Sequence, residues 1–410
     1  MTRELLTGNA AAAWGARLAD VDYIPAYPIT PQTEIMETLA RWTADGHLAA
    51  RFVTMDSEHS MLTAAGAAAA TGARVFTATS SQGLLYAFEM LYAVAGWRVP
   101  LVVVNVSRAL AAPITLEPDH NDVLAARDSG FLQFHCETCQ EVLDSVLLAY
   151  RLAEHRDVLL PVLVNLDGFY LSFTREPVVI PAPEAVRDFL PQYEPAHAHF
   201  SASHAMAQGV AVLGGSAYAF FRYQMQRAAE EALRVYDQVA AEFRDCFGRF
   251  YGPLEGYCLD DAEWVIVMTN SFATMGKAAV KRMRDRGEKV GLVRLRMIRP
   301  FPHAQIARTL AARRAVGVID QNLSVGKGGI LFAEVASALQ GTASPPLRSF
   351  IGGLGGRRFR DEDFDQIFAA LREAEHTGGS AEPFLLYSES EYQHMLAMLR
   401  VAGHPVEEPK

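Results

Sequence analysis

The chain has 410 residues, of which 50% are hydrophobic and 20% charged, so it can bury two sizeable cores and does not have a disordered composition. Its formal net charge of −10 argues against nucleic acid as the main ligand, because phosphate backbones are bound by clustered lysines and arginines. The longest apolar runs are only strand-length, which argues against a membrane span, and four cysteines in so long a chain are typical of a reducing compartment; we therefore expect a cytoplasmic protein.

Strand and helix patterns alternate along the first 180 residues. Alternation of this kind predicts a parallel sheet covered by helices on both faces. Residues 176–202 are rich in Pro, Ala and His, which indicates a connector, and a long helical pattern follows at 218–247. The expected strands are 21–25, 52–55, 74–78, 101–106 and 160–166, and the expected helices are 9–18, 33–45, 58–70, 83–94 and 141–155.

A second α/β unit begins at Trp264 and repeats the same alternation. We expect its strands at WVIVMTN (264–270), VGLVRLRMI (290–298), AVGVID (315–320) and LRSFI (347–351), with helices at 274–287, 303–313 and 329–339. The predicted division is a first domain over 1–250, which includes the helical connector, a second domain over 251–375, and a tail over 376–410 with one helix at 389–401.

A rigid turn, Tyr27-Pro28-Ile29-Thr30-Pro31, directly follows the first expected strand. In open parallel sheets, the loops at the carboxyl ends of the strands form the ligand crevice. Prolines on both sides of Thr30 restrict its backbone, so its hydroxyl is held with little freedom. Composition alone leaves two alternatives open: Thr30 binds a ligand, or it caps the following helix.

Glu58 lies in Asp56-Ser57-Glu58-His59-Ser60, again between a strand and a helix. A carboxylate in the first turn of a helix is stabilised by the positive end of the helix, so Glu58 can be a capping residue. Its functional alternative is a hydrogen bond to a ligand nitrogen.

Arg108 follows the apolar strand LVVVNV, where a guanidinium is well placed to bind a carboxylate through two hydrogen bonds. A solvated arginine is the alternative. The next loop contains His120-Asn121-Asp122 and Arg127-Asp128, which are either ligand contacts or a self-satisfied polar loop.

Three other motifs carry weaker signals. Cys136 and Cys139 form one C-x-x-C pair, which is half the ligand set of an iron–sulfur cluster, and buried thiols are the expected alternative. The glycine-rich segments 326–329 and 352–356 resemble phosphate loops only in part and are expected to be tight turns. The sequence has no Cys/His metal-ligand spacing, so we expect no metal site in this chain.

Taken together, YPITP, DSEHSMLTAAGAAAATGARVFTATSSQGL and SRALAAPITLEPDHNDVLAARDSGF resemble the α subunit of the 2-oxoacid:ferredoxin (pyruvate-type) oxidoreductases. RLRMIRPFP and VIDQNLSVGKGG resemble the second domain of the same family. The resemblance implies an α/β fold class, with a thiamine-diphosphate-binding-type parallel-sheet domain followed by a transketolase C-terminal-like α/β domain.

The resemblance also implies roles for individual residues. Glu58 matches the glutamate that hydrogen-bonds the pyrimidine ring of thiamine diphosphate, and Pro28 and Ile29 belong to the motif that contacts the cofactor. Thr30 matches the threonine near the reacting carbonyl, and Arg108 the arginine that pairs with the substrate carboxylate. The implied reaction is oxidative decarboxylation of a small 2-oxo acid to an acyl-CoA, with coenzyme A as co-substrate and electrons passed to iron–sulfur clusters.

The chain lacks the GDG motif of a diphosphate and Mg²⁺ site as well as cluster-ligand cysteines. The resemblance therefore implies a β subunit that carries the diphosphate and Mg²⁺, a γ subunit, and a ferredoxin-like δ subunit with [4Fe–4S] clusters.

One departure concerns the substrate: the loop ITLEPDHND has Glu117 and Pro118 where pyruvate-type members have an aromatic residue and an aspartate. An aryl, branched or dicarboxylic 2-oxo acid stays open beside pyruvate. A non-catalytic structural homologue and a self-contained transketolase-like enzyme are the alternatives; the first would lack Glu58, Thr30 or Arg108, and the second needs GDG.

Overall fold

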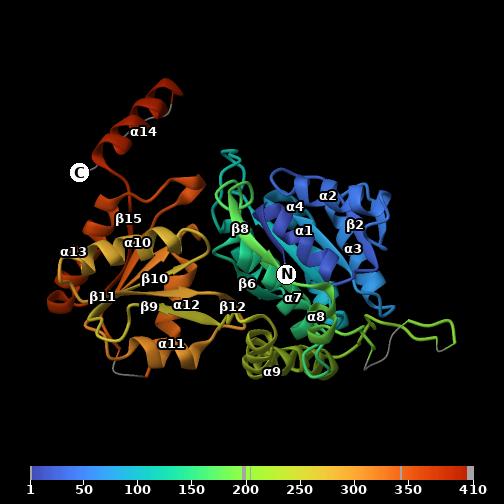
Figure 1. The fold of residues 1–410 in the computed structure, drawn as a ribbon. Coiled ribbons are helices and arrows are strands. Elements are labelled where there is room, and N and C mark those ends of the chain that lie inside the picture. Colours follow the sequence, from blue (N-terminus) through green and yellow to red (C-terminus); the bar gives the residue numbers. More distant parts are fainter. Residues whose placement is uncertain (1, 196–199, 204, 342–343, 404–410) are drawn as a thin grey trace.

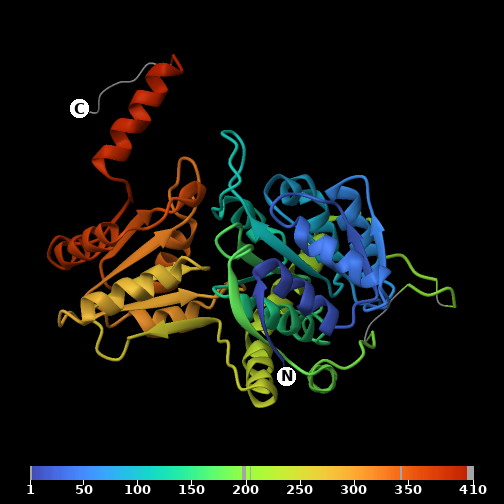
Figure 2. The ribbon, with the colours of Figure 1, turned by 45° about the horizontal axis from the view of Figure 1, so that its top comes forward.

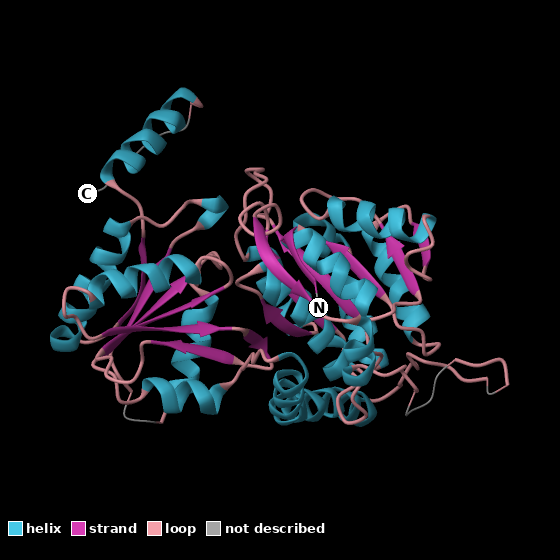
Figure 3. Ribbon diagram, viewed as in Figure 1, coloured by secondary structure: helices cyan, strands magenta, loops and turns pink. Residues whose placement is uncertain are grey.

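The computed structural model describes residues 2–195, 200–203, 205–341 and 344–403, which form two α/β lobes side by side (Figure 1). Each lobe has its own sheet with helices packed on it (Figure 3). This arrangement confirms the expected fold class. Within the described residues, no helix is both long enough and apolar enough to cross a membrane.

The sheet of the first lobe has the strand order β12-β6-β7-β5-β4. Its strands β4 to β7 run parallel, whereas β12 pairs antiparallel with β6. The parallel pair β2 and β3 continues this sheet through a bridge between Tyr23 and Val75, so the carboxyl ends of these strands open on one edge. The strands are β2 (Tyr23–Ala26), β3 (Arg51–Thr54), β4 (Phe76–Thr79), β5 (Val102–Ser107), β6 (Leu132–His135), β7 (Val162–Asp167) and β12 (Met297–Arg299).

Helices cover both faces of this sheet because its strands are apolar on both sides. Ala11, Ala12, Ala13 and Ala16 of α1 are fully buried and allow close packing; a Cβ built on Gly15 would lie 2.7 Å from Val146 of α7. A separate antiparallel pair, β1 (Thr2–Thr7) and β8 (Arg175–Ile180), lies beside them. The helices are α1 (Gly8–Leu18), α2 (Thr33–Ala44), α3 (Glu58–Ala69), α4 (Ser81–Tyr86), α5 (Phe88–Trp97), α6 (Asn121–Ala125), α7 (Cys139–Ala153), α8 (Pro183–Phe189) and α9 (Gly215–Phe247).

The second lobe contains a six-stranded sheet in the order β15-β14-β13-β10-β11-β9, parallel except for β9. Its strands are β9 (Leu254–Tyr257), β10 (Trp264–Thr269), β11 (Val290–Leu295), β13 (Ala315–Asp320), β14 (Leu347–Ile351) and β15 (Ser380–Leu385). Its helices are α10 (Ala273–Arg284), α11 (His303–Leu310), α12 (Ile330–Leu339) and α13 (Asp361–Thr377), and α14 (Glu389–Val401) extends away from the sheet (Figure 2). Residues 376–410 were predicted to be a tail with one helix, and the structure places strand β15 of the second sheet within them. Positions 404–410 of this tail are outside the described residues.

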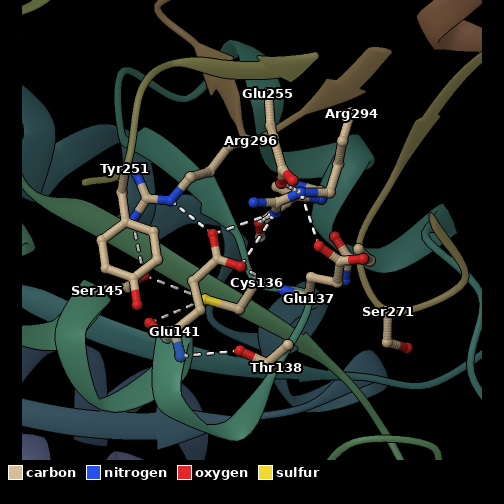
Figure 4. Close-up of polar contacts among 12 residues, drawn as sticks. Cys136, Glu137, Thr138, Glu141, Ser145, Tyr251, Glu255, Ser271, Arg294 and Arg296 are labelled. Carbon is tan, nitrogen blue, oxygen red and sulfur yellow. Dashed lines mark hydrogen bonds and ion pairs between the residues drawn. The ribbon is translucent and has the colours of Figure 1, made fainter. Parts of the chain in front are cut away.

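The segment VGLVRLRMI, expected as one strand, divides between the two lobes. Its first part is β11 of the second sheet, and its last part is β12, the edge strand of the first sheet. The break falls at Arg296, whose side chain is fully buried and whose Nε donates to Glu141 of α7 at 2.7 Å. Arg294 reaches the same carboxylate and also Glu255, so a buried ion cluster joins the lobes where the segment divides (Figure 4).

Candidate functional site

The Tyr27–Pro31 turn follows β2 and is held from both sides. Gln32 Nε2 donates to the Tyr27 carbonyl at 2.8 Å, and Asn9 Nδ2 donates to the Pro31 carbonyl at 2.9 Å. Gln32, not Thr30, is the N-cap residue of α2, so Thr30 does not cap this helix. Thr30 is exposed at the sheet edge, beside the exposed Pro28 and the half-buried Ile29.

Glu58 is the first residue of α3, and it does not cap that helix either. The cap is Ser57, whose hydroxyl accepts the Ser60 N–H at 3.2 Å. The Glu58 side chain is only 6% exposed, yet it has no hydrogen bond or ion pair with another described residue. The other buried acids in the described part of the chain all have such partners. A buried carboxylate without a partner is costly unless a ligand supplies one.

Arg108 follows β5 and is 7% exposed. Its Nη1 donates to the Thr30 carbonyl at 2.7 Å and its Nη2 to Gln82 Oε1, while its Nε has no acceptor. Burial lowers the pKa of this guanidinium, and the carboxylate of Asp122 partly offsets that effect. The structure therefore brings Arg108 and the Thr30 backbone together and leaves the positive charge without a carboxylate in ion-pair contact.

Asp122 fixes the backbone around this arginine. Its carboxylate accepts the backbone N–H of Arg108 at 3.2 Å and of Ser81 at 3.1 Å, and the Ser107 hydroxyl at 3.0 Å. Asn105 adds a fourth donor at 3.1 Å. Asp122 is thus committed to protein contacts, as a self-satisfied polar loop predicts.

His120 links the same loop to the second lobe. Its Nε2 lies 2.8 Å from Asp167, whose carboxylate also accepts the Ser271 hydroxyl at 2.6 Å and Asn270 Nδ2 at 3.1 Å. Burial alone would lower the pKa of His120, but the carboxylates of Asp167, Asp119 and Asp122 together raise it. Burial and the neighbouring His120 lower the pKa of His135 to about 3, so His135 is the neutral ring of the two.

Gln82 and Gly83, which the sequence analysis did not single out, lie between the two unpaired charges. Gln82 accepts from Arg108, and a Cβ built on Gly83 would lie 2.6 Å from Glu58 Oε1. The first turn of α4 therefore contacts both groups. Both residues follow a parallel strand, which is the signal that could have found them.

The remaining motifs lie outside this site. Burial raises the pKa of Cys136 to about 12, and the Cys139 thiol is likewise buried with a raised pKa, so both are inert thiols. The 326–329 segment is a tight turn in which Ser324 and Gly328 exchange backbone hydrogen bonds. The Asp320 carboxylate already accepts the first N–H groups of α12, so no anion is needed there. The 352–356 segment also forms turns, with Gly353, Gly355 and Gly356 at positive φ.

Arg127 and Asp128 pair with each other at 3.5 Å on the rim of a separate groove of about 820 Å³ between α9 and the 299–305 segment. They are therefore not part of the strand-end site. In the part of the chain that the structure describes, no cluster of three or more His, Cys, Asp or Glu residues has the arrangement of a metal site.

An aminopyrimidine ring fits the donor set at the strand ends. Glu58 offers a largely buried carboxylate with no partner among the described residues, and Gly83 leaves no side chain between that carboxylate and α4. Arg108 offers a cation for a small carboxylate nearby. Among the described residues, the site thus combines one carboxylate and one guanidinium that have no ion-pair partner.

Two protein-family models match this chain, one in each lobe. Residues 14–241 match the family described as pyruvate flavodoxin/ferredoxin oxidoreductase, thiamine diphosphate-binding, and residues 262–364 match pyruvate:ferredoxin oxidoreductase core domain II. Pyruvate synthase subunit PorA of Methanocaldococcus jannaschii is 44% identical over 91% of this chain and 95% of its own length. Ketoisovalerate oxidoreductase subunit VorA of Pyrococcus horikoshii is 40% identical over 92% and 95%.

Two solved structures share the fold at low sequence identity. One is the 2-oxoglutarate:ferredoxin oxidoreductase from Magnetococcus marinus with 2-oxoglutarate, coenzyme A and succinyl-CoA bound, which matches with a TM-score of 0.70 at 20% identity. This match covers 91% of our chain and 65% of that longer chain. The other is a split-gene transketolase, with a TM-score of 0.54 at 12% identity over 88% and 96% of the two chains.

Proposed function

The chain belongs to the pyruvate flavodoxin/ferredoxin oxidoreductase family, and from this membership we propose that it is the α subunit of a thiamine-diphosphate-dependent 2-oxoacid:acceptor oxidoreductase. In the proposed reaction, a 2-oxo acid and coenzyme A yield an acyl-CoA, CO₂ and a proton. The two electrons released pass one at a time to iron–sulfur clusters. This is the activity class that the sequence motifs imply.

The pair of buried, unpaired opposite charges carries this proposal. Glu58 follows β3 and Arg108 follows β5, with β4 and β2 between these two strands, and the first turn of α4 contacts both residues. Burying two groups of opposite charge without an ion-pair partner for either costs free energy that packing alone does not explain. A cofactor with a basic ring nitrogen and a substrate with a carboxylate would supply one partner to each.

Each residue then has a separate task. Bound thiamine diphosphate would supply the nucleophilic carbon and the electron sink for decarboxylation. Glu58 would hold a proton at the pyrimidine ring through a short, desolvated hydrogen bond. Arg108 would bind and orient the acid, and the Thr30 hydroxyl, exposed on the same edge, would contact the reacting carbonyl. Pro28 and Ile29 would form the wall of the turn against the cofactor.

The charge distribution favours a monocarboxylic substrate. Of the four buried arginines in the described chain, Arg74, Arg294 and Arg296 pair with carboxylates, and only Arg108 does not. A dicarboxylic acid would find one free buried cation in this chain instead of two. Pyruvate and branched-chain 2-oxo acids, which the names of the two relatives describe, are therefore the preferred candidates.

The proposal requires further subunits. We infer a β subunit with the diphosphate and Mg²⁺ site, a γ subunit, and a ferredoxin-like δ subunit with [4Fe–4S] clusters, because the sequence has neither a GDG motif nor cluster-ligand cysteine runs. The relatives are named as subunits, which supports this inference. The expected compartment is the cytoplasm.

The test is purification of the native complex, followed by acceptor reduction with pyruvate, 2-oxoisovalerate, phenylglyoxylate and 2-oxoglutarate. We expect CoA-dependent, thiamine-diphosphate-dependent reduction with one of the first three. Higher kcat/KM with 2-oxoglutarate would overturn the monocarboxylic assignment. A correctly assembled complex without activity toward any of the four acids would favour the non-catalytic alternative.

A further inference from the structure

Gln82 holds Arg108 through a neutral acceptor. Its Oε1 accepts from Arg108 Nη2 and also from the Ser81 hydroxyl at 2.6 Å. On its other side the guanidinium donates to the Thr30 carbonyl, which is again a neutral oxygen. Both contacts fix the orientation of the guanidinium without adding a negative charge in contact with it.

This arrangement differs from that of every other buried arginine in the described residues. Arg74 is held by Glu154 at 2.7 Å, and Arg296 by Glu141 at 2.7 Å. Arg294 lies within 3.1 Å of both Glu137 and Glu141. Among the buried arginines that the structure describes, carboxylates are thus the usual partners, and Arg108 alone has an amide in that place.

The backbone gives Gln82 little freedom to move. Ser81 has a φ of 47° and its N–H donates to Asp122 at 3.1 Å, which fixes the start of α4. Gly83 fits against Glu58 with no room for a Cβ. The amide is therefore held between the two proposed functional groups.

We propose that Gln82 is a positioning residue: it orients Arg108 toward the carboxylate of the 2-oxo acid while keeping the arginine charge free for that substrate. The inference rests on the proposed function. It predicts that the charge at position 82, more than its shape or hydrogen-bonding capacity, decides how well the acid binds.

Two variants separate this role from a structural one. Gln82→Glu preserves the size and the acceptor oxygen but places a carboxylate on Arg108, and we expect the KM for the 2-oxo acid to rise at least about thirty-fold. Gln82→Leu removes the acceptor without adding charge, and we expect a smaller rise of about three- to ten-fold. A merely structural role predicts the reverse order, because Glu is the closer substitute in shape and bonding.

The measurements are steady-state kinetics on the reconstituted complex, with KM for the acid, for thiamine diphosphate and for coenzyme A determined separately. Only the KM for the acid should change strongly. The Kd for oxamate, an unreactive analogue of the acid, should rise by a similar factor. Gln224→Glu, which adds the same charge on an exposed part of α9, is the matched control and should leave all values unchanged.

An unchanged KM for the acid in Gln82→Glu, or a larger effect of Gln82→Leu, would overturn the inference. If the Gln82→Glu complex does not assemble, the Gln82→Leu complex provides the test. In that complex, equal increases in the KM for the acid and in the KM for thiamine diphosphate would overturn the inference. Failure of the wild-type complex to oxidise any 2-oxo acid would instead overturn the proposed function, so the two failures are distinguishable.

Discussion

Glu58 and Arg108 are buried side chains of opposite charge, and neither forms an ion pair with a residue that the structure describes. Glu58→Gln keeps the shape but removes the charge, so the side chain can no longer form a charge-assisted hydrogen bond with the cofactor. The loss of about 1.5–3 kcal/mol predicts a turnover at least about ten- to a hundred-fold lower. Kinetics on the assembled complex measure it, with Glu37→Gln on the exposed side of α2 as control. Near-wild-type turnover would leave Glu58 without a catalytic role.

Arg108→Leu removes the free cation at the end of β5. We expect kcat/KM for the 2-oxo acid to fall about thirty- to a thousand-fold, equivalent to about 2–4 kcal/mol, with thiamine diphosphate affinity unchanged. Arg98→Leu is the control, because Arg98 donates to the Val158 and Leu159 carbonyls at the opposite end of the strand. That control should lower stability and leave the kinetics intact. An Arg108→Leu complex with wild-type kcat/KM would assign the substrate carboxylate to another residue.

At this scale the sequence singled out Glu58, Thr30 and Arg108 as candidates but not Gln82. Glu58, Arg108 and Thr30 follow strands in a recognisable motif, and their positions after strands are where ligands bind in parallel sheets. Gln82 carries no charge and resembles an ordinary helix-opening residue. Its contact with Arg108 depends on how β4 and β5 lie side by side, which the sequence alone does not reveal.

Among the elements, the loop after Arg108 forms backbone hydrogen bonds with the other lobe. The Gly356 N–H donates to the Pro118 carbonyl at 2.7 Å, and the His120 N–H donates to the Gln321 carbonyl at 2.8 Å. Tyr170 donates its hydroxyl to the Gly356 carbonyl at 2.6 Å. The glycine-rich 352–356 segment thus supports the loop that leads away from the proposed substrate site.

Gly356→Ala tests this support. Gly356 has a φ of 76°, and a Cβ there would lie 2.6 Å from the Cβ of Glu117, so the loop must shift. We expect a raised KM for the 2-oxo acid in addition to a backbone cost of about 1–2 kcal/mol. Gly287→Ala has the same kind of backbone strain at a φ of 85° but meets nothing within 4 Å. Thermal melting and kinetics of both variants separate strain from loop displacement; identical KM values would reject the support role.

Strand patterns predicted most elements of both sheets but not which sheet each strand joins. VGLVRLRMI is one apolar run, and periodicity gives no sign that Met297–Arg299 pairs with β6 of the other lobe. The reason is a tertiary contact: Arg294 and Arg296 both bind Glu141 on α7, and the chain passes from the second lobe to the first at this point. Short strands such as β9 lacked a pattern long enough to predict.

For the whole molecule, the first expectation concerns the isolated chain. Because the sequence has no GDG motif, this subunit should hold only the pyrimidine end of the cofactor. Calorimetry on the purified chain should detect weak thiamine diphosphate binding or none, and addition of the β subunit should restore tight binding. Tight, Mg²⁺-dependent binding to the chain alone would contradict the division of the site between subunits.

The second expectation concerns pH. The pKa of His120 is raised above its ordinary 6.5, so the folded chain binds this proton more tightly than the unfolded chain does. Its contribution to stability is therefore complete below pH 6.5 and is lost as pH rises through the raised pKa. We expect the melting temperature of the wild type, relative to His120→Gln, to fall over that interval. A constant difference between the two proteins would show that the pair with Asp167 is not ionic.

The edge strand that the second lobe contributes to the first sheet has a mechanical consequence. Rotating one lobe against the other would break the β12–β6 hydrogen bonds and expose Arg296 and Glu141 to water. Breaking a buried ion pair costs several kcal/mol, so this junction opposes rotation of one lobe against the other. An opening that admits substrate to the proposed site would therefore have to form away from this junction.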